Sequence, residues 1–370
     1  TVLCSTDLLT EGVDFDLTYF PLKHLGYKAV TVAGSDILAM NARPSQLMVS
    51  LGVSAKMSVE ALQELYEGIA FACREQGIDL VGGDTKASVT GLVLSLTAVG
   101  HAPKERIVSR GGAQQNDLIC ISGNLGAAYM GLRLLEREKR VLADVENPEP
   151  KFGGYEYLLE KYLKPRLRRD IVDALAEEGI VPTSMIDLSD GLASDLLQIC
   201  KASKCGARIY LDRIPIAKQT YALAEELHAD PVVAALNGGE DHELLFTVPL
   251  AMQEQVMKMG CVDVIGHITP ESTGAYLVTP DGSDIRLRAQ GERVTRAGIS
   301  RYGWRTGRPQ VCGRLFLTVY VGMSGCRDVG QRRCGGWTAA RRRCGVFPEA
   351  VMRKSGRGDE NEKAAFVGRL

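Results

Sequence analysis

Apolar residues recur along most of the chain with the spacings of helices and strands. Residues 58–77 carry them every three or four positions between Ser58, a predicted N-cap, and Gly77, a predicted stop. A second helix is predicted from Pro21, because proline is tolerated in a first helical turn. Short apolar runs predict strands at 46–53, 80–81, 92–99, 118–122, 207–210, 244–248, 262–268 and 275–278. Strands that alternate with helices predict an α/β (α+β) fold.

The segment around residues 180–200 predicts a strand, a tight turn and a helix. An apolar run precedes Asp187, and helical spacing begins at Leu192. Ser189 or Asp190 is expected to cap this helix by accepting its first backbone N–H groups. Asp187, Ser189 and Asp190 are also a set of hard oxygen ligands that suits Mg²⁺. A cap without a metal is the alternative interpretation.

Four other polar segments follow or interrupt apolar runs. They are Ser5-Thr6-Asp7 at a strand's end, Gly34-Ser35-Asp36 late in the first helix, Gly82-Gly83-Asp84-Thr85 after a short strand, and 237–243 before another strand. A carboxylate among apolar residues, such as Asp36, either faces solvent or has a partner such as a metal. Glycines 82–83 let a ligand approach the backbone, and Asp84 can hold a metal beside phosphates. Plain turns, a glycine hairpin and a turn histidine at His242 are the alternatives.

Basic residues supply two candidate phosphate contacts. Arg110 precedes a glycine turn and can pair with a phosphate, although a surface arginine is the alternative. A basic cluster near a predicted helix at 167–178 is interpreted as mostly a solvated face. It comprises Lys161, Lys164, Arg166, Arg168 and Arg169. No GxxxxGK[ST] motif occurs, and no GxGxxG motif opens a helix, so a phosphate site here depends on metal held by aspartates.

Charge is distributed unevenly along the 370 residues, which are enough for two domains. The formal net charge is −1, yet residues 291–370 hold 17 basic and 6 acidic residues, and residues 1–290 hold 27 basic and 39 acidic ones. An acidic body argues against nucleic acid as its partner and fits a protein that gathers divalent cations. Apolar runs are too short to span a membrane, and no signal peptide is visible.

The cysteines and the last eighty residues complete the composition. Ten cysteines occur without CxxC pairing, and the six in the body lie in apolar segments like reduced thiols, which predicts a cytoplasmic protein. Residues 291–370 have poor hydrophobic periodicity, 15 Arg against 2 Lys, and no zinc-ligand spacing. We expect this segment to be an atypical Arg/Gly/Cys-rich tail outside the native fold.

Taken together, the polar segments resemble the thiamine-monophosphate kinases of the AIR-synthase-like (PurM-like) superfamily. The motifs occur in the same order over roughly residues 1–290, with Lys23-His24-Leu25-Gly26-Tyr27-Lys28-Ala29 between the first two. They are Ser5-Thr6-Asp7, Gly34-Ser35-Asp36, Gly82-Gly83-Asp84-Thr85, Arg110-Gly111-Gly112-Ala113, Ile186-Asp187-Leu188-Ser189-Asp190-Gly191-Leu192 and Gly238-Gly239-Glu240-Asp241-His242-Glu243-Leu244. Each motif alone is weak, and six in order make a specific match.

The resemblance implies a PurM-like two-domain fold. Residues 1–105 are expected to form an N-terminal mixed-sheet domain that builds a barrel across a homodimer and binds ATP and Mg²⁺. Residues 106–290 are expected to form a C-terminal α/β domain. The implied activity is transfer of the ATP γ-phosphoryl group to thiamine monophosphate, which gives thiamine diphosphate and ADP.

The resemblance also implies roles for single residues, and no catalytic side chain besides metal ligands. The implied ligands of several Mg²⁺ ions are Ser5, Thr6, Asp7, Asp36, Asp84, Asp187 and Asp190. The implied ATP contacts are Gly83, Asp84, Arg110 and Ser189, and the implied substrate contacts are Asp14 and Glu240. An acceptor phosphate is already anionic, so transfer needs metal to bring two polyanions together rather than a strong base.

Three departures from the family pattern separate this sequence from a typical member. The Gly-Asp-Asp motif expected before the first strand is missing, Asp14 stands where many members have His, and Gly291 is followed by Glu292 rather than an aromatic residue. We therefore expect a chain truncated at its front and altered at its back. The alternatives are another PurM-like enzyme, a non-catalytic Mg-nucleotide-binding dimer, and a nucleic-acid-binding protein that acts through the Arg-rich tail.

Overall fold

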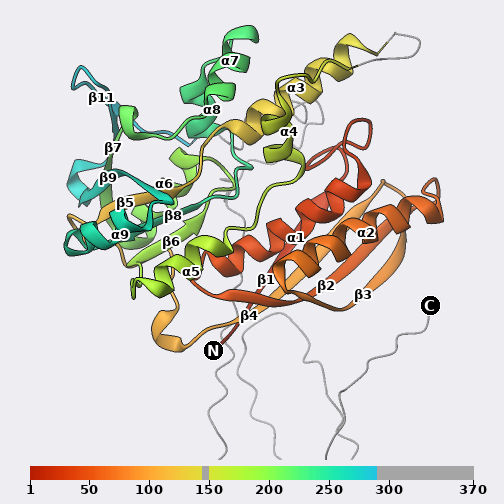
Figure 1. Cartoon of the computed structure of the whole chain (residues 1–370), viewed down its shortest axis with the longest axis horizontal. Helices are drawn as coiled ribbons and strands as arrows, with labels where there is room; N and C mark the ends of the chain where they lie inside the picture. Colours follow the sequence, from red (N-terminus) through yellow and green to blue (C-terminus); the bar gives the residue numbers. More distant parts are fainter. Residues whose placement is uncertain (144–149, 290–370) are drawn as a thin grey trace, which may run out of the picture. The chain divides into compact units, whose positions relative to one another are not determined.

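The computed structural model describes residues 1–143 and 150–289, which form two β-sheets with helices packed against them (Figure 1). The predicted tail at 291–370 lies outside the described residues. Chain order places the first sheet within residues 2–101 and the second within residues 118–286. The predicted mixed α/β class is confirmed.

The first sheet has four strands in the order β1-β4-β2-β3, and only the β2–β3 pair is parallel. Its elements are β1 (Val2–Thr10), α1 (Leu22–Leu38), β2 (Arg43–Ser54), α2 (Val59–Gln76), β3 (Asp79–Ser88) and β4 (Val93–His101). Two predicted boundaries were wrong. Ser5-Thr6-Asp7 lies in the middle of β1 rather than at its end, and Gly82-Gly83-Asp84 lies inside β3 rather than in a loop.

The second sheet has seven strands in the order β11-β10-β7-β9-β5-β8-β6. Its strands are β5 (Leu118–Ser122), β6 (Ser184–Asp187), β7 (Cys205–Tyr210), β8 (Leu244–Val248), β9 (Val262–Pro270), β10 (Ala275–Val278) and β11 (Asp284–Arg286). The helices of this part are α3 (Ala127–Val141), α4 (Glu156–Leu163), α5 (Arg169–Glu177), α6 (Leu192–Ser203), α7 (Lys218–Glu226), α8 (Pro231–Asn237) and α9 (Gln253–Met259). The described residues also contain four single-turn 3₁₀ helices: η1 (Lys104–Arg106), η2 (Leu211–Arg213), η3 (Leu250–Met252) and η4 (Glu271–Thr273).

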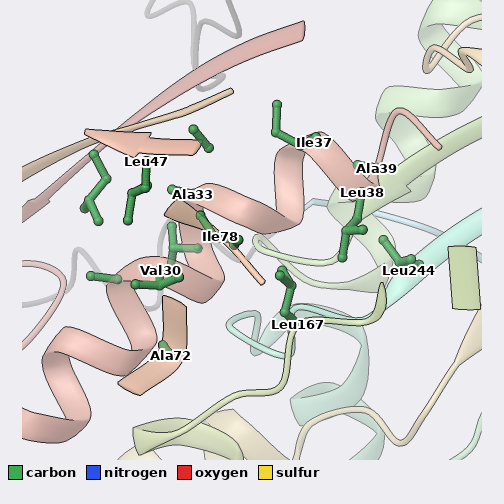
Figure 2. Packing of buried hydrophobic residues seen from close by; sticks show 14 of the residues in the cluster. Val30, Ala33, Ile37, Leu38, Ala39, Leu47, Ala72, Ile78, Leu167 and Leu244 are labelled. Carbon is green, nitrogen blue, oxygen red and sulfur yellow. The ribbon is translucent and has the colours of Figure 1, made fainter. Parts of the chain in front are cut away.

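Helix α1 is buried from Leu25 to Leu38, because it packs between the first sheet and residues of the second part. Figure 2 shows its side chains Val30, Ile37 and Leu38 among residues of both parts, including Leu47 and Leu167. Leu167 fits against Gly34, where a Cβ atom would lie 3.0 Å from the leucine side chain. Since α1 is fixed on both sides, the polar residues in its last turns are held between the two sheets.

Candidate active site

A cavity of about 320 Å³ lies beside the C-terminal half of α1, and we call it the aspartate cavity. Six residues that matter to its chemistry are Ser5, Asp36, Met40, Arg110, Met185 and Asp187. They come from β1, from α1 and the turn after it, from the segment after η1, and from β6. Four residues predicted from separate sequence motifs, Ser5, Asp36, Arg110 and Asp187, therefore line one space.

The alternation of β1 decides which of its polar residues point toward this cavity. Ser5 and Asp7 are buried on the face that α1 covers, whereas Thr6 is exposed on the other face and bonds the Thr97 hydroxyl. The Ser5 hydroxyl donates a hydrogen bond of 2.5 Å to Asp36 Oδ2. Asp36 therefore does not face solvent, and its carboxylate is fixed against β1.

Asp187 ends β6 as predicted and is almost fully buried. Its Oδ2 accepts a hydrogen bond of 3.1 Å from the Ser35 hydroxyl and lies 3.8 Å from His242 Nδ1. Ser35 and Asp36 are adjacent in α1. Ser35 bonds Asp187, and Asp36 bonds Ser5. The two aspartates that line the cavity are held by residues from both parts of the chain.

Two loops that come from distant parts of the sequence are joined by backbone hydrogen bonds beside Asp187. Glu240 N–H donates to Ser189 O, His242 N–H donates to Leu188 O, and Leu188 N–H donates to Glu243 O. The second loop needs left-handed backbone at Gly239, Glu240 and His242, with φ angles of 72°, 65° and 48°. Non-glycine residues in this region are strained, and such strain is concentrated at functional sites.

The predicted cap of the helix after Asp187 was wrong. Helix α6 begins after Gly191 without a side-chain cap, and Ser189 and Asp190 instead donate their backbone N–H groups to Asp195 Oδ2. Burial, followed by the nearby carboxylates of Asp190 and Asp187, raises the pKa of Asp195 well above its ordinary value. Asp195 therefore holds the turn from inside the helix, in place of the predicted cap by Ser189 or Asp190.

Glu240 meets a buried cation that the sequence motifs did not identify. Lys28 Nζ lies 2.8 Å from Glu240 Oε2, and it lies 3.9 Å from the centre of the Tyr162 ring. Partial burial raises the pKa of Glu240, but Lys28 and His242 outweigh this effect and hold it below its ordinary value. The signal in the sequence was a lysine within the otherwise apolar face of the first helix.

His242 joins Glu240 to Asp187 and is not a turn histidine on the surface. Its two ring nitrogens lie 3.8 Å from Asp187 Oδ2 and 3.8 Å from Glu240 Oε2. Burial lowers the pKa of His242, but the two carboxylates raise it to about 9. A protonated imidazole therefore partly compensates the buried negative charge of this site.

The neighbouring acids of the same loop have structural roles. Asp241 accepts the backbone N–H groups of Gly126 and Ala128 at the start of α3, at 2.9 and 3.3 Å. Glu243 is buried and forms ion pairs with Lys161, at 2.9 Å, and with Arg168. The interpretation of the basic cluster as a solvated face was therefore wrong for these two cations.

Gly83 and Asp84 are not near the aspartate cavity within one chain. They lie on β3, and β1 forms the opposite edge of the first sheet. Asp84 pairs in register with Ser50 and is exposed. At Gly83 a Cβ atom would overlap with the Val49 carbonyl oxygen, so close strand pairing requires a glycine here.

Two further candidates have local contacts. Asp14 accepts the backbone N–H and the hydroxyl of Thr10, at 2.7 and 3.0 Å, and so closes the turn after β1. Arg110 lines the aspartate cavity, and its guanidinium donates to the Gln198 side chain at 2.9 Å. Arg110 is thus oriented by α6, whereas Asp14 has a structural function that needs no ligand.

The oxygen ligands of the aspartate cavity fit Mg²⁺ better than a metal ion whose whole coordination shell comes from protein side chains. Asp36, Asp187 and the Ser5 hydroxyl are hard oxygen donors, and both carboxylates are more than nine-tenths buried. Within residues 1–143 and 150–289, no three acidic, histidine or cysteine side chains are close enough to form a metal site by themselves. Mg²⁺ commonly binds one or two carboxylates and completes its shell with water and substrate phosphates.

Comparisons with known proteins identify the family of this chain. Residues 1–102 match the family AIR synthase related protein, N-terminal domain, and residues 119–278 match AIR synthase related protein, C-terminal domain. The thiamine-monophosphate kinase of Buchnera aphidicola is 36% identical over 283 residues, which cover 74% of this chain and 81% of that protein. The enzyme of Escherichia coli K12 is 34% identical, with 80% and 84% covered.

The fold agrees as well as the sequence. A solved structure of AaThiL complexed with AMPPCP and TMP superposes with a TM-score of 0.67 and 30% identity, and covers 77% of this chain and 84% of that one. The family models, the sequence relatives and the solved structure all indicate the same family. The chain therefore belongs to the AIR synthase related proteins, and within them to the thiamine-monophosphate kinases.

Proposed function

We propose that this chain transfers the γ-phosphoryl group of ATP to thiamine monophosphate and releases thiamine diphosphate and ADP. The observation that carries the proposal is the aspartate cavity, where Ser5, Asp36, Arg110 and Asp187 meet. Its relatives at 30–36% identity carry this activity in their names, and one solved neighbour holds AMPPCP, a non-hydrolysable ATP analogue, together with TMP. Oxygen donors and a guanidinium in one cavity support a reaction in which two polyanions have to meet.

The residues that would hold Mg²⁺ are the seven oxygen donors predicted from the motifs. Within one chain, Ser5, Asp36 and Asp187 line the cavity, and Asp7 is buried on the same face of β1 as Ser5. When bound, Mg²⁺ supplies charge neutralisation and alignment of the phosphates for in-line transfer. The other proposed ligands lie elsewhere in the chain. Asp190 is in the turn after β6, Thr6 is on the exposed face of β1, and Asp84 is on β3 at the opposite edge of the first sheet.

The chain's own residues orient the reactants and do not need to remove a proton. The acceptor is a phosphate monoester, which is already largely anionic at neutral pH, so no strong general base is required. Arg110 is oriented by Gln198 and is proposed to contact ATP, together with Gly83, Asp84 and Ser189. Glu240 and Asp14 are proposed to contact the acceptor.

We propose that the protein acts as a homodimer, because the candidate ligands lie at opposite edges of the first sheet. β1 and β3 are separated by two strands, which is about 14 Å at the usual strand spacing. The sheet face away from α1 and α2 exposes Leu8, Met48 and Asp84. Pairing two sheets would cover this face and would bring Asp84 of one chain toward β1 of another, the edge strand that carries Thr6 on this face and Ser5 on the covered face.

Two broader expectations belong to the same proposal. Residues 1–105 and 106–290 are proposed as separate domains, each centred on one of the two sheets. Among the described residues, no helix has both the length and the apolar character to cross a membrane. We propose that the enzyme works in the cytoplasm, where ATP is available, with small-molecule substrates rather than nucleic acid.

The direct test measures thiamine diphosphate formed from thiamine monophosphate and ATP, with and without Mg²⁺. We expect turnover that disappears on chelation and falls by at least about a hundredfold in Asp187→Asn, because a carboxylate ligand is lost. Lys104→Gln, an exposed change in η1, is the matched control and should retain full turnover. Full turnover in Asp187→Asn would contradict the ligand assignment, and ATP binding without product would indicate a non-catalytic nucleotide-binding protein.

A further inference from the structure

A second cavity, of about 500 Å³, is lined by residues of α1 and α2 and by Lys164, and we call it the aromatic cavity. The lining residues used below are Lys23, His24, Tyr27, Phe71, Arg74 and Lys164. None of them lines the aspartate cavity. His24 and Asp36 are twelve positions apart in α1, which is about 18 Å along the helix axis. The two cavities are therefore different sites.

The walls of the aromatic cavity combine flat rings with positive charge. The rings of Tyr27 and Phe71 have centres 6.1 Å apart, and 47% of the Phe71 surface is exposed. The Lys164 ammonium lies 4.8 Å from the Tyr27 ring centre and 5.1 Å from that of Phe71. An exposed phenylalanine beside a tyrosine offers a stacking surface, and the lysine is already placed at its edge.

Positive charge is only partly compensated around these rings. Lys23 is paired with Glu67 at 2.7 Å, but no acidic partner is found for Arg74 or Lys164 among the described residues. Burial, and then the Lys164 ammonium, lower the pKa of His24, so its ring is neutral near pH 7 and can donate or accept hydrogen bonds. Two cations beside two rings complement an anion that is attached to a flat heterocycle.

We propose that the aromatic cavity binds an organic phosphate that carries a heteroaromatic ring. The ring would stack on Phe71 and Tyr27, and the phosphate would meet Arg74 and Lys164. A volume of about 500 Å³ lies in the usual range for cofactor-sized ligands. A nucleoside phosphate and a thiamine phosphate share this chemistry, so both are probes in the test.

The test places a fluorescent reporter in the cavity of the full chain. Phe71→Trp keeps a stacking ring, and the unsubstituted chain supplies the background of its own two tryptophans. Adenosine monophosphate and thiamine diphosphate are titrated separately, with adenosine and inorganic phosphate as partial ligands. We expect saturable quenching with a dissociation constant below about 1 mM, and much weaker responses to the partial ligands.

Charge-removal variants show whether the signal comes from this cavity. Arg74→Gln with Lys164→Gln should raise the dissociation constant at least about tenfold and leave kinase turnover unchanged. Lys56→Gln with Lys104→Gln removes the same charge from exposed positions elsewhere and should leave the dissociation constant unchanged. A response to only one of the two phosphates supports the proposal and shows which of the two ligands the aromatic cavity binds.

Three results would overturn the proposal. They are the absence of any quenching up to about 10 mM, equal responses to inorganic phosphate and the complete ligands, and an unchanged dissociation constant in the Arg74→Gln, Lys164→Gln variant. Because kinase turnover is measured separately in every variant, failure of this proposal is distinguishable from failure of the proposed activity.

Discussion

At the scale of single residues, the site depends on charges that are buried next to each other. Lys28, His242 and two carboxylates form a continuous chain of contacts from the aromatic ring of Tyr162 to Asp187. Removing one member takes away part of the neutralisation of the desolvated charge next to it. The residues of this chain should therefore affect stability as well as activity.

Replacing Lys28 with Met should lower the free energy of unfolding. Loss of one partner from a fully buried ion pair costs about 3–5 kcal/mol, and because Glu240 retains 26% exposure we expect about 1–3 kcal/mol. Urea unfolding measures the change. The double variant Lys28→Met with Glu240→Gln should lose less than the sum of the two single changes. Additive losses would show that the two side chains do not interact.

Asp241 should make stability depend on pH. Burial raises its pKa from 3.8 to about 7, although the backbone N–H groups of Gly126 and Ala128 oppose the shift. The folded state thus holds this proton more tightly than the unfolded state. The resulting stabilisation is fully present below about pH 4 and is lost as the pH rises through about 7.

Asp241→Asn provides the comparison, because an amide oxygen still accepts from Gly126 and cannot ionise. Between pH 5 and pH 8, the wild-type free energy of unfolding should fall by at least about 1 kcal/mol relative to this variant. Parallel pH profiles of the two proteins would rule out a raised pKa at Asp241.

At the scale of elements, hydrophobic spacing predicted most of the described strands and several helices, including α2 with its Ser58 cap and Gly77 stop. It failed where tertiary pairing overrides local preference. Gly82 and Gly83 favour a loop by composition, yet they form part of β3 because β2 supplies a parallel partner. Ser5 and Asp7 break the apolar alternation of β1 on its covered face, because the site occupies that position.

The sequence identified the aspartates of the candidate site, but it did not identify the residues that hold those aspartates in place. Ser5, Asp36, Arg110 and Asp187 were identified from residue type and order, and the structure brings them to one cavity. Contacts between residues far apart in the sequence leave no pattern that can be recognised in either segment alone. The pairing of Glu243 with Lys161 joins residues 82 positions apart, and Asp195 replaces the expected caps by reaching back along the chain.

The close pairing of β2 and β3 yields a prediction at this scale. Gly83→Ala should destabilise the protein by about 1–3 kcal/mol, because the added Cβ overlaps with the Val49 carbonyl oxygen. Gly82→Ala is a matched control, since no atom lies within 4 Å of a Cβ at that position. Thermal unfolding compares the two. Equal effects would indicate that strand propensity, rather than close approach, requires the glycines.

At the scale of the whole molecule, the proposed homodimer predicts complementation between inactive chains. Asp36→Asn and Asp84→Asn should each be inactive alone, because each removes one proposed ligand from every site. In a mixed dimer, one of the two shared sites has both native residues. Equal mixing after refolding should therefore restore about one quarter of wild-type turnover, since half of the dimers are mixed and half of their sites are intact.

The result distinguishes shared from unshared sites. If Asp36 and Asp84 served the same site within one chain, every site in a mixed dimer would still lack one ligand, and no turnover would return. Sedimentation of the mixture is the control that dimers form. Wild-type chain carried through the same refolding sets the scale for full recovery.

The strand order of the second sheet has a consequence for synthesis of the protein. Among the described strands, β6, which ends at Asp187, pairs only with β8, and the interior strand β5 pairs only with β8 and β9, which follow it by more than a hundred residues. While the ribosome is still translating the segment before Val248, neither strand has a partner. A nascent chain or C-terminally shortened fragment that ends there exposes unpaired apolar strands to chaperones and proteases.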